Sequence, residues 1–200
     1  MISNIESIFK NRQVDLIGNY NKYAVMICIT EEESPSIVFE VRALTLTSQP
    51  GDVSLPGGKI EPGESSMVAA IRETMEELNI GKEDMKVIGA MDYFVSPYNQ
   101  VIYPFVGILK KCDFQWSKDE VHKIFKVPVD FFLSNEPEKY DINIIPEFPD
   151  NFPYHLIVGG KNYKFSKGKR EQYFYKYNEY VIWGFTALII KRFIDIIKQS

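Results

Sequence analysis

Residues 58–80 read GKIEPGESSMVAAIRETMEELNI, and this stretch carries the most informative pattern in the sequence. A loop rich in glycine and proline leads into residues 65–79, which contain neither and therefore favour a helix. At about 100° per residue, apolar side chains share one stripe and carboxylates lie on the opposite arc: Val68, Ile71, Met75 and Leu78 against Glu73, Glu76 and Glu77. Carboxylates at this spacing repel one another by ~0.2–0.5 kcal/mol per exposed pair, and a hard divalent cation would relieve that repulsion.

An acidic helix face is often only a solvated surface. The loop before the helix distinguishes this interpretation from a metal site. The pairs Gly57-Gly58 and Pro62-Gly63 allow tight turns and close backbone approach. Glu64 is spaced to turn back toward the helix carboxylates. Arg72 stands among them, where its planar fork can orient a carboxylate by a bidentate contact. Together these features favour a metal site.

The same stretch resembles the Nudix box, G-x5-E-x7-R-E-U-x-E-E-x-G-U, where U is a bulky aliphatic residue. The positions that match are Gly58, Glu64, Arg72, Glu73, Glu76, Glu77 and Ile80. Thr74 stands where an aliphatic residue is usual, and Asn79 replaces the last glycine, a mild change because Asn also adopts the left-handed conformation that ends helices. The resemblance implies an α+β fold, a Nudix-type α/β/α sandwich with a mixed sheet and a loop–helix–loop catalytic motif. Its members hydrolyse a nucleoside diphosphate linked to another group.

The resemblance also assigns roles to individual residues. Glu73, Glu76 and Glu77 are expected to ligate Mg²⁺ or Mn²⁺, with Glu64 as a further ligand or a supporting carboxylate. Arg72 and Glu120 join them as catalytic candidates, since many Nudix enzymes carry an acid after the box that assists the metal or the water. Which carboxylate acts as general base stays open, and Glu120 as a solvated charge is the alternative. Gly57 and Gly58 would let backbone groups approach the pyrophosphate.

The residues before the box resemble the signature of coenzyme A pyrophosphatases, LLTxRSx3Rx3Gx3FPGG. Arg42, Gly51, Pro56, Gly57 and Gly58 match it, whereas Glu40, Ala43, Thr47 and Leu55 depart from it, and Thr47 replaces an arginine. Residues 182–187, IWGFTA, resemble the opening of the subfamily's last helix. This implies metal-dependent hydrolysis of CoA or acyl-CoA to 3′-phospho-AMP and 4′-phosphopantetheine products. ADP-ribose or a dinucleotide is the alternative substrate, and a non-catalytic ligand-sensing domain is disfavoured because every box carboxylate is present.

One basic run stands out in this acidic chain and is a candidate for binding substrate. It comprises Lys161, Lys164, Lys167, Lys169 and Arg170, interleaved with Tyr163 and Phe165. CoA carries a 3′-phosphate that needs a cationic partner, and we expect at least one of these side chains, with Lys164 as the candidate, to supply it. A solvated loop is the alternative. Arg42 is expected to contact a phosphate, with a surface ion pair as its alternative. Trp183 and Phe185 are expected to be core aromatics, with an adenine platform as the alternative.

Composition bounds the remaining possibilities. The 200 residues fit a single domain, 1–200, with an N-terminal helix at about 3–13 and an insertion-like segment at about 134–180. A content of 45% hydrophobic and 14% aromatic residues excludes global disorder, and a net charge of −4 argues against nucleic acid as a partner. Cys28 and Cys112 are expected to be buried thiols. We expect a cytoplasmic enzyme of small nucleotides with no membrane contact, and a homodimer is possible.

Residue patterns give the order of the remaining elements. Apolar, β-branched runs predict strands, and segments with helical spacing predict helices. The expected strands are 23–30, 36–42, 86–94, 101–109, 123–127, 155–158 and 173–177. The expected helices are 4–13, 65–79, 128–133 and 184–198.

Overall fold

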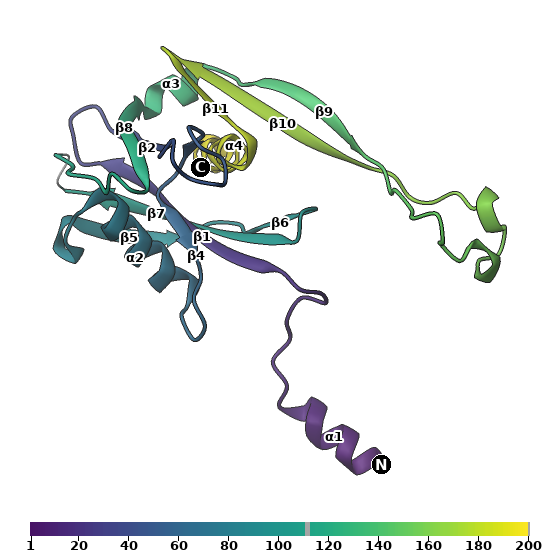
Figure 1. Ribbon diagram of the computed structural model, residues 1–200. Coiled ribbons are helices and arrows are strands. Elements are labelled where there is room, and N and C mark those ends of the chain that lie inside the picture. The colour runs from purple at the N-terminus through teal and green to yellow at the C-terminus, as the bar shows by residue number, and fades with distance from the viewer. Residues whose placement is uncertain (111–112, 200) are drawn as a thin grey trace.

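The computed structural model describes residues 1–110 and 113–199, and its main element is a mixed sheet (Figure 1). Strand β1 (Asn21–Thr30) runs parallel to β7 (Gln100–Leu109) and antiparallel to β2 (Ser36–Arg42). The other strands extend this centre: β3 (Val53–Ser54) and β8 (Val121–Pro128) pair with β2, β4 (Gly57–Lys59) pairs with β1, and β5 (Met85–Ala90) and β6 (Phe94–Ser96) pair with β7. The predicted α+β class with a mixed sheet is confirmed.

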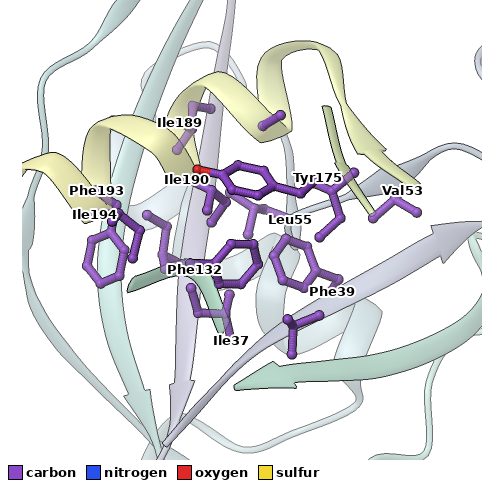
Figure 2. Close-up of a cluster of buried hydrophobic side chains, with 14 of the residues drawn as sticks. Ile37, Phe39, Val53, Leu55, Phe132, Tyr175, Ile189, Ile190, Phe193 and Ile194 are labelled. Atoms are coloured by element: carbon purple, nitrogen blue, oxygen red, sulfur yellow. The ribbon is translucent and has the colours of Figure 1, made fainter. Parts of the chain in front are cut away.

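Helices cover both faces of this sheet because successive side chains of β1 point to opposite sides. Met26 and Cys28 belong to the apolar layer beneath helix α2 (Ser66–Leu78). Ile27 belongs to the opposite layer, beneath helix α4 (Gly184–Gln199). Figure 2 shows this second layer, with Ile189, Ile190, Phe193 and Ile194 of α4 packed over Ile37 and Phe39 of β2. The predicted α/β/α sandwich is therefore confirmed.

Helix α2 is rotated relative to the expected apolar stripe. Its buried residues are Ala69, Ala70, Thr74, Glu77 and Leu78, whereas Val68 is 51% exposed. The small Ala69 and Ala70 allow the helix to approach β1 closely, and Thr74 satisfies its hydroxyl by donating to the Ala70 carbonyl at 2.7 Å. The prediction that Val68 belongs to the apolar stripe was wrong for this reason. The same rotation carries Glu77 into the interior.

Both ends of α2 follow from the sequence. Ser65 caps the first turn, because its Oγ accepts the Val68 N–H at 3.3 Å. Asn79 ends the helix in the left-handed region, at φ 49° and ψ 55°, as its place in the glycine position of the box predicts.

A second, antiparallel sheet lies within residues 138–183. It consists of β9 (Glu138–Ile144), β10 (Gly168–Tyr177) and β11 (Tyr180–Trp183), and Figure 1 shows β9 and β10 extending as a long ribbon away from the main sheet. The strand expected at residues 155–158 was wrong. Two short 3₁₀ turns, Tyr154–Leu156 and Gly160–Asn162, lie there instead. Gly159 and Gly160 both have positive φ, which turns the chain back.

The remaining elements differ from expectation mainly at their ends. The N-terminal helix α1 is Ile2–Lys10, and all of its residues are exposed. The strand expected at 86–94 is divided between β5 and β6, and a 3₁₀ turn at Lys82–Asp84 precedes it. Helix α3 is Val129–Ser134, directly after Pro128. Cys28 is a buried free thiol, as expected, and Cys112 lies outside the described residues. Within residues 1–110 and 113–199, the helices are too short or too polar to cross a bilayer.

Candidate active site

Glu77 connects the helix of the box to the loop before it. Strand β4 pairs with β1 so that Gly57 lies opposite Val25, and the Gly57 N–H donates to Glu77 Oε2 at 2.7 Å. Only 5% of the Glu77 surface is exposed. Burial raises the pKa of this carboxyl, and the nearby charges of Glu40 and Glu73 raise it further. A buried carboxylate with other acids beside it is costly unless a cation joins it.

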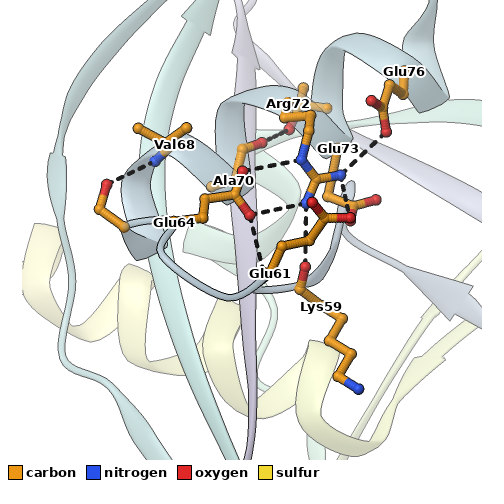
Figure 3. A network of polar contacts seen from close by, with 10 residues as sticks. Lys59, Glu61, Glu64, Val68, Ala70, Arg72, Glu73 and Glu76 are labelled. Atoms are coloured by element: carbon orange, nitrogen blue, oxygen red, sulfur yellow. Dashed lines mark hydrogen bonds and ion pairs between the residues drawn. The ribbon is translucent and has the colours of Figure 1, made fainter.

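Arg72 gathers three further carboxylates of the box (Figure 3). Its Nε and Nη2 donate to the two oxygens of Glu64 at 3.0 and 3.1 Å, which is the predicted bidentate contact. Its Nη1 donates to Glu73 at 2.8 Å and to Glu76 at 3.3 Å, and its Nη2 also donates to the Lys59 carbonyl at 3.2 Å. These hydrogen bonds lower the pKa of Glu64. Arg72 therefore holds the loop against the helix.

Glu40 is a site residue that the sequence analysis considered only as a departure from a signature. It is 1% exposed within β2 and accepts the Ser54 hydroxyl at 2.8 Å. Among the described residues its Oε2 finds no hydrogen-bond partner. Burial raises its pKa, against the lowering effects of Ser54 and Arg42. The signal in the sequence was one acid inside the apolar run SIVFEVR.

The two glycines predicted to approach the pyrophosphate also have a packing role. A Cβ on Gly57 would lie 2.3 Å from the Ala24 carbonyl, at a φ of 145°. A Cβ on Gly58 would lie 2.4 Å from Cδ of Glu73. The Gly57 N–H is engaged by Glu77. Both positions therefore need glycine because β1 and the carboxylates, as they stand, leave no room for a side chain.

Replacing Gly58 by alanine is expected to lower kcat by about 10-fold while leaving the fold intact, because the new methyl group displaces only the flexible end of Glu73. The matched control is Gly89→Ala in β5, where a Cβ meets no described atom within 4 Å. Steady-state rates and thermal unfolding of both variants provide the test. Equal rates for the two variants would contradict the steric argument.

A cavity of about 860 Å³ opens beside these carboxylates. Of the predicted site residues, it is lined by Arg42, Gly57, Gly58, Glu73, Glu77 and Glu120. Glu64, Arg72 and Glu76 are not among the lining residues. Arg72 connects them to the wall, because it binds Glu64, Glu76 and the lining residue Glu73. Burial raises the pKa of both Glu73 and Glu77, and the charge of Glu120, which lines the same cavity, raises both further.

The structure departs from the sequence analysis on the opposite wall. Lys164 is exposed near the far end of the β9–β10 ribbon, outside the described lining of the cavity, and Arg170 is the member of the basic run that lines it. Trp183 also lines the cavity and is 42% exposed, so its expected core position was wrong. Phe185 packs against the core and lines the cavity as well.

The donor set fits a hard divalent cation in its chemistry. In the part of the chain that the structure describes, no three potential ligands converge closely enough to hold a metal as they stand, since Arg72 draws Glu64, Glu73 and Glu76 onto itself. The candidate ligands are nonetheless carboxylate oxygens at the wall of an open cavity, as Mg²⁺ and Mn²⁺ prefer. Burial raises the pKa of Glu77 in this wall and of Glu40 near it, so each carboxyl would release its proton more readily once a cation lay beside it. Among the described residues, the buried Oε2 of Glu40 has no hydrogen-bond partner.

A mixed sheet between helices, with a carboxylate-bearing loop–helix–loop at a cavity, defines a class of enzymes that cleave diphosphates. The chain belongs to the Nudix family and is a pyrophosphohydrolase, since the NUDIX domain matches residues 20–148. Enzymes of this family generally use divalent metals such as Mg²⁺ or Mn²⁺.

Relatives agree with this assignment. The uncharacterized Nudix hydrolase NudL of Photorhabdus laumondii is 31% identical over 178 residues, covering 88% of this chain and 84% of that protein. The chloroplastic Nudix hydrolase 22 of Arabidopsis thaliana is 29% identical, over 89% of this chain and 56% of that longer protein. Among solved structures, a MutT/nudix family protein from Enterococcus faecalis aligns with 99% of this chain and 70% of its own, at a TM-score of 0.55 and 13% identity. This last likeness concerns the fold alone.

Proposed function

We propose that this chain hydrolyses the pyrophosphate bond of coenzyme A or acyl-CoA, giving 3′-phospho-AMP and a 4′-phosphopantetheine product. The observation that carries the proposal is Arg42, the arginine shared with the CoA pyrophosphatase signature. It lines the same cavity as Glu73, Glu77 and Glu120, and its Nε is buried without a hydrogen-bond partner in the described chain. An anionic substrate would supply that partner.

The box residues would divide the work around the pyrophosphate. Glu73, Glu76 and Glu77 would hold Mg²⁺ or Mn²⁺, with Glu64 as a further or supporting ligand, and Arg72 would keep Glu64 and Glu73 in place. When bound, such an ion neutralises charge on phosphate oxygens and lowers the pKa of an attacking water. Arg42 would balance the charge of the diphosphate, and Glu120 would orient the water or support the ion.

The size of the cavity supports a large substrate. Its volume of about 860 Å³ lies toward the upper end of the range for ordinary ligand sites, ~300–1,000 Å³. Its lining combines acidic, basic and aromatic side chains. The alternative within the family is another nucleoside diphosphate derivative, ADP-ribose or a dinucleotide. Thr47, which replaces a signature arginine and is exposed, is the feature that favours this alternative.

The test is a panel of diphosphates incubated with Mg²⁺ or Mn²⁺, with the products identified by mass. We expect kcat/KM for CoA to exceed that for ADP-ribose by at least ~10-fold, since CoA offers an additional phosphate for charged contacts. Activity should vanish with EDTA and return with the metal. Rates on ADP-ribose equal to those on CoA would overturn the proposed substrate but not the family assignment.

A further inference from the structure

Within the basic run of residues 161–170, Arg170 is the member that lines the cavity. It lies near the start of β10, and its guanidinium carbon lies 5.4 Å from the ring centre of Tyr98 and 5.4 Å from that of Phe185. Its Nη2 donates to Gln172 Oε1 at 2.6 Å. Two aromatic faces and one amide therefore hold the guanidinium in a fixed orientation.

Gln172 completes a set of hydrogen-bond donors on the same face of β10, because residues two apart in a strand point to the same side. Gln172 is 5% exposed and lines the cavity. Since its Oε1 accepts from Arg170, its Nε2 is left as a donor, and among the described residues that atom has no hydrogen-bond partner. The Nε of Arg170 is likewise buried without one. Such donors are costly to bury unless a ligand satisfies them.

The charge of Arg170 is also unbalanced within the protein. The chain has 27 acidic residues, yet across residues 1–110 and 113–199 no carboxylate lies within ion-pair distance of this guanidinium. The neighbouring Lys169, by contrast, lies 3.9 Å from Asp141 on the outside of the ribbon. The rings of Tyr98 and Phe185 compensate part of the positive charge, and a negatively charged ligand would compensate the rest.

Arg42 and Arg170 reach the cavity wall from different strands, β2 and β10. Arg42 lies two residues after Glu40 on β2 and so belongs with the carboxylates, beside which a pyrophosphate would bind. Arg170 has Tyr98, Phe185 and Gln172 as its neighbours. A ligand that carries a diphosphate and a second, separate anion would engage both arginines.

We propose that Arg170 and the Gln172 amide form a subsite for a phosphate monoester carried on the ribose of the substrate. The identity of that group as the 3′-phosphate of CoA rests on the proposed function. The planar fork of Arg170 matches a phosphate dianion, and the Gln172 Nε2 adds a neutral donor. Lys164, which the sequence favoured for this role, is too far along the ribbon to line the cavity.

Equilibrium binding of two nucleotides, measured by calorimetry in EDTA, tests the subsite without turnover. Adenosine 3′,5′-bisphosphate carries the ribose monoester, whereas 5′-AMP lacks it. We expect Arg170→Ala to weaken bisphosphate binding by about 10-fold or more and to change AMP binding by less than about two-fold. Lys169→Ala removes the neighbouring charge on the outside of the ribbon and should leave both affinities unchanged. An equal loss for both nucleotides, or no preference of the wild type for the bisphosphate, would overturn the subsite.

Two further variants keep the result independent of misfolding. Arg170→Lys retains the charge between the rings, and Gln172→Met removes the amide at nearly constant shape; each should selectively weaken the bisphosphate, by less than Arg170→Ala. Thermal unfolding checks that each variant is folded. Turnover of CoA against dephospho-CoA then separates the two proposals. If the wild type hydrolyses neither, the proposed function fails, while the subsite stands or falls on the nucleotide affinities alone.

Discussion

Replacing Glu77 by glutamine is expected to lower kcat by at least ~100-fold and, at the same time, to stabilise the metal-free protein by ~1–2 kcal/mol. The amide keeps the shape of the side chain and can still accept the Gly57 N–H, which lies 2.7 Å from Oε2. It removes an ionisable carboxyl that is 5% exposed and lies near Glu40 and Glu73, where burial disfavours its charged form. Activity and stability should therefore move in opposite directions.

The stability gain should also depend on pH in a defined direction. Since the folded state raises the pKa of Glu77 above its ordinary value of 4.5, the native protein binds more protons than the unfolded chain above that pH. The free energy of unfolding of the metal-free wild type then falls as pH rises from about 4.5, and the advantage of Glu77→Gln is larger at pH 8 than at pH 5. Urea unfolding in EDTA at both pH values measures this.

Glu147→Gln serves as the control for Glu77→Gln because Glu147 is an exposed acid in the distal segment. It should alter neither rate nor stability. A Glu77→Gln enzyme with wild-type kcat at saturating Mg²⁺ would contradict the ligand role of Glu77.

Replacing Arg72 by alanine should also lower kcat/KM by at least ~100-fold, and it should destabilise the protein by ~1–3 kcal/mol. The variant loses contacts to Glu64, Glu73 and Glu76 together and leaves three neighbouring carboxylates without their shared cation. It also frees the Lys59 carbonyl that Arg72 anchors at 3.2 Å. The loop of the box would then no longer be fixed to the helix.

Arg72→Lys separates charge from geometry in this network. Lysine keeps the positive charge but cannot bond both oxygens of Glu64 through a planar fork, so we expect an intermediate rate and most of the stability. Steady-state kinetics and urea unfolding of the two variants give the comparison. If alanine and lysine were equally active, positioning of Glu64 by Arg72 would play no part in turnover.

The local features of the box were determined by the sequence. Ser65 begins α2 and Asn79 ends it, because a hydroxyl cap and a left-handed residue act within one turn of their own position. The partnership of Arg72 with Glu64 was predictable for a similar reason, because the two residues are eight apart and only the helix cap and about two helical turns separate them. The apolar, β-branched runs at residues 23–30 and 36–42 likewise predicted buried strands.

Prediction was less successful where a residue's environment depends on another element. The expected apolar stripe of α2 failed at Val68, because the close approach of Ala69 and Ala70 to the sheet set the rotation of the helix. The same rotation buried Glu77 beside Glu40, a residue of β2 that is 37 positions earlier in the chain. Local periodicity describes which residues share a face but not which face the sheet will cover.

The wall opposite the carboxylates was decided only by the tertiary structure. Lys164 and Arg170 belong to one basic run, and composition alone does not separate them. In an extended chain six residues span about 20 Å, so a ribbon that directs Arg170 into the cavity carries Lys164 toward its distant end. The sequence by itself therefore determined the family, the carboxylates and the ends of their helix. The tertiary structure selected the arginine, the amide and the aromatic rings that face them, because contacts between distant segments depend on how β10 and α4 pack against the sheet.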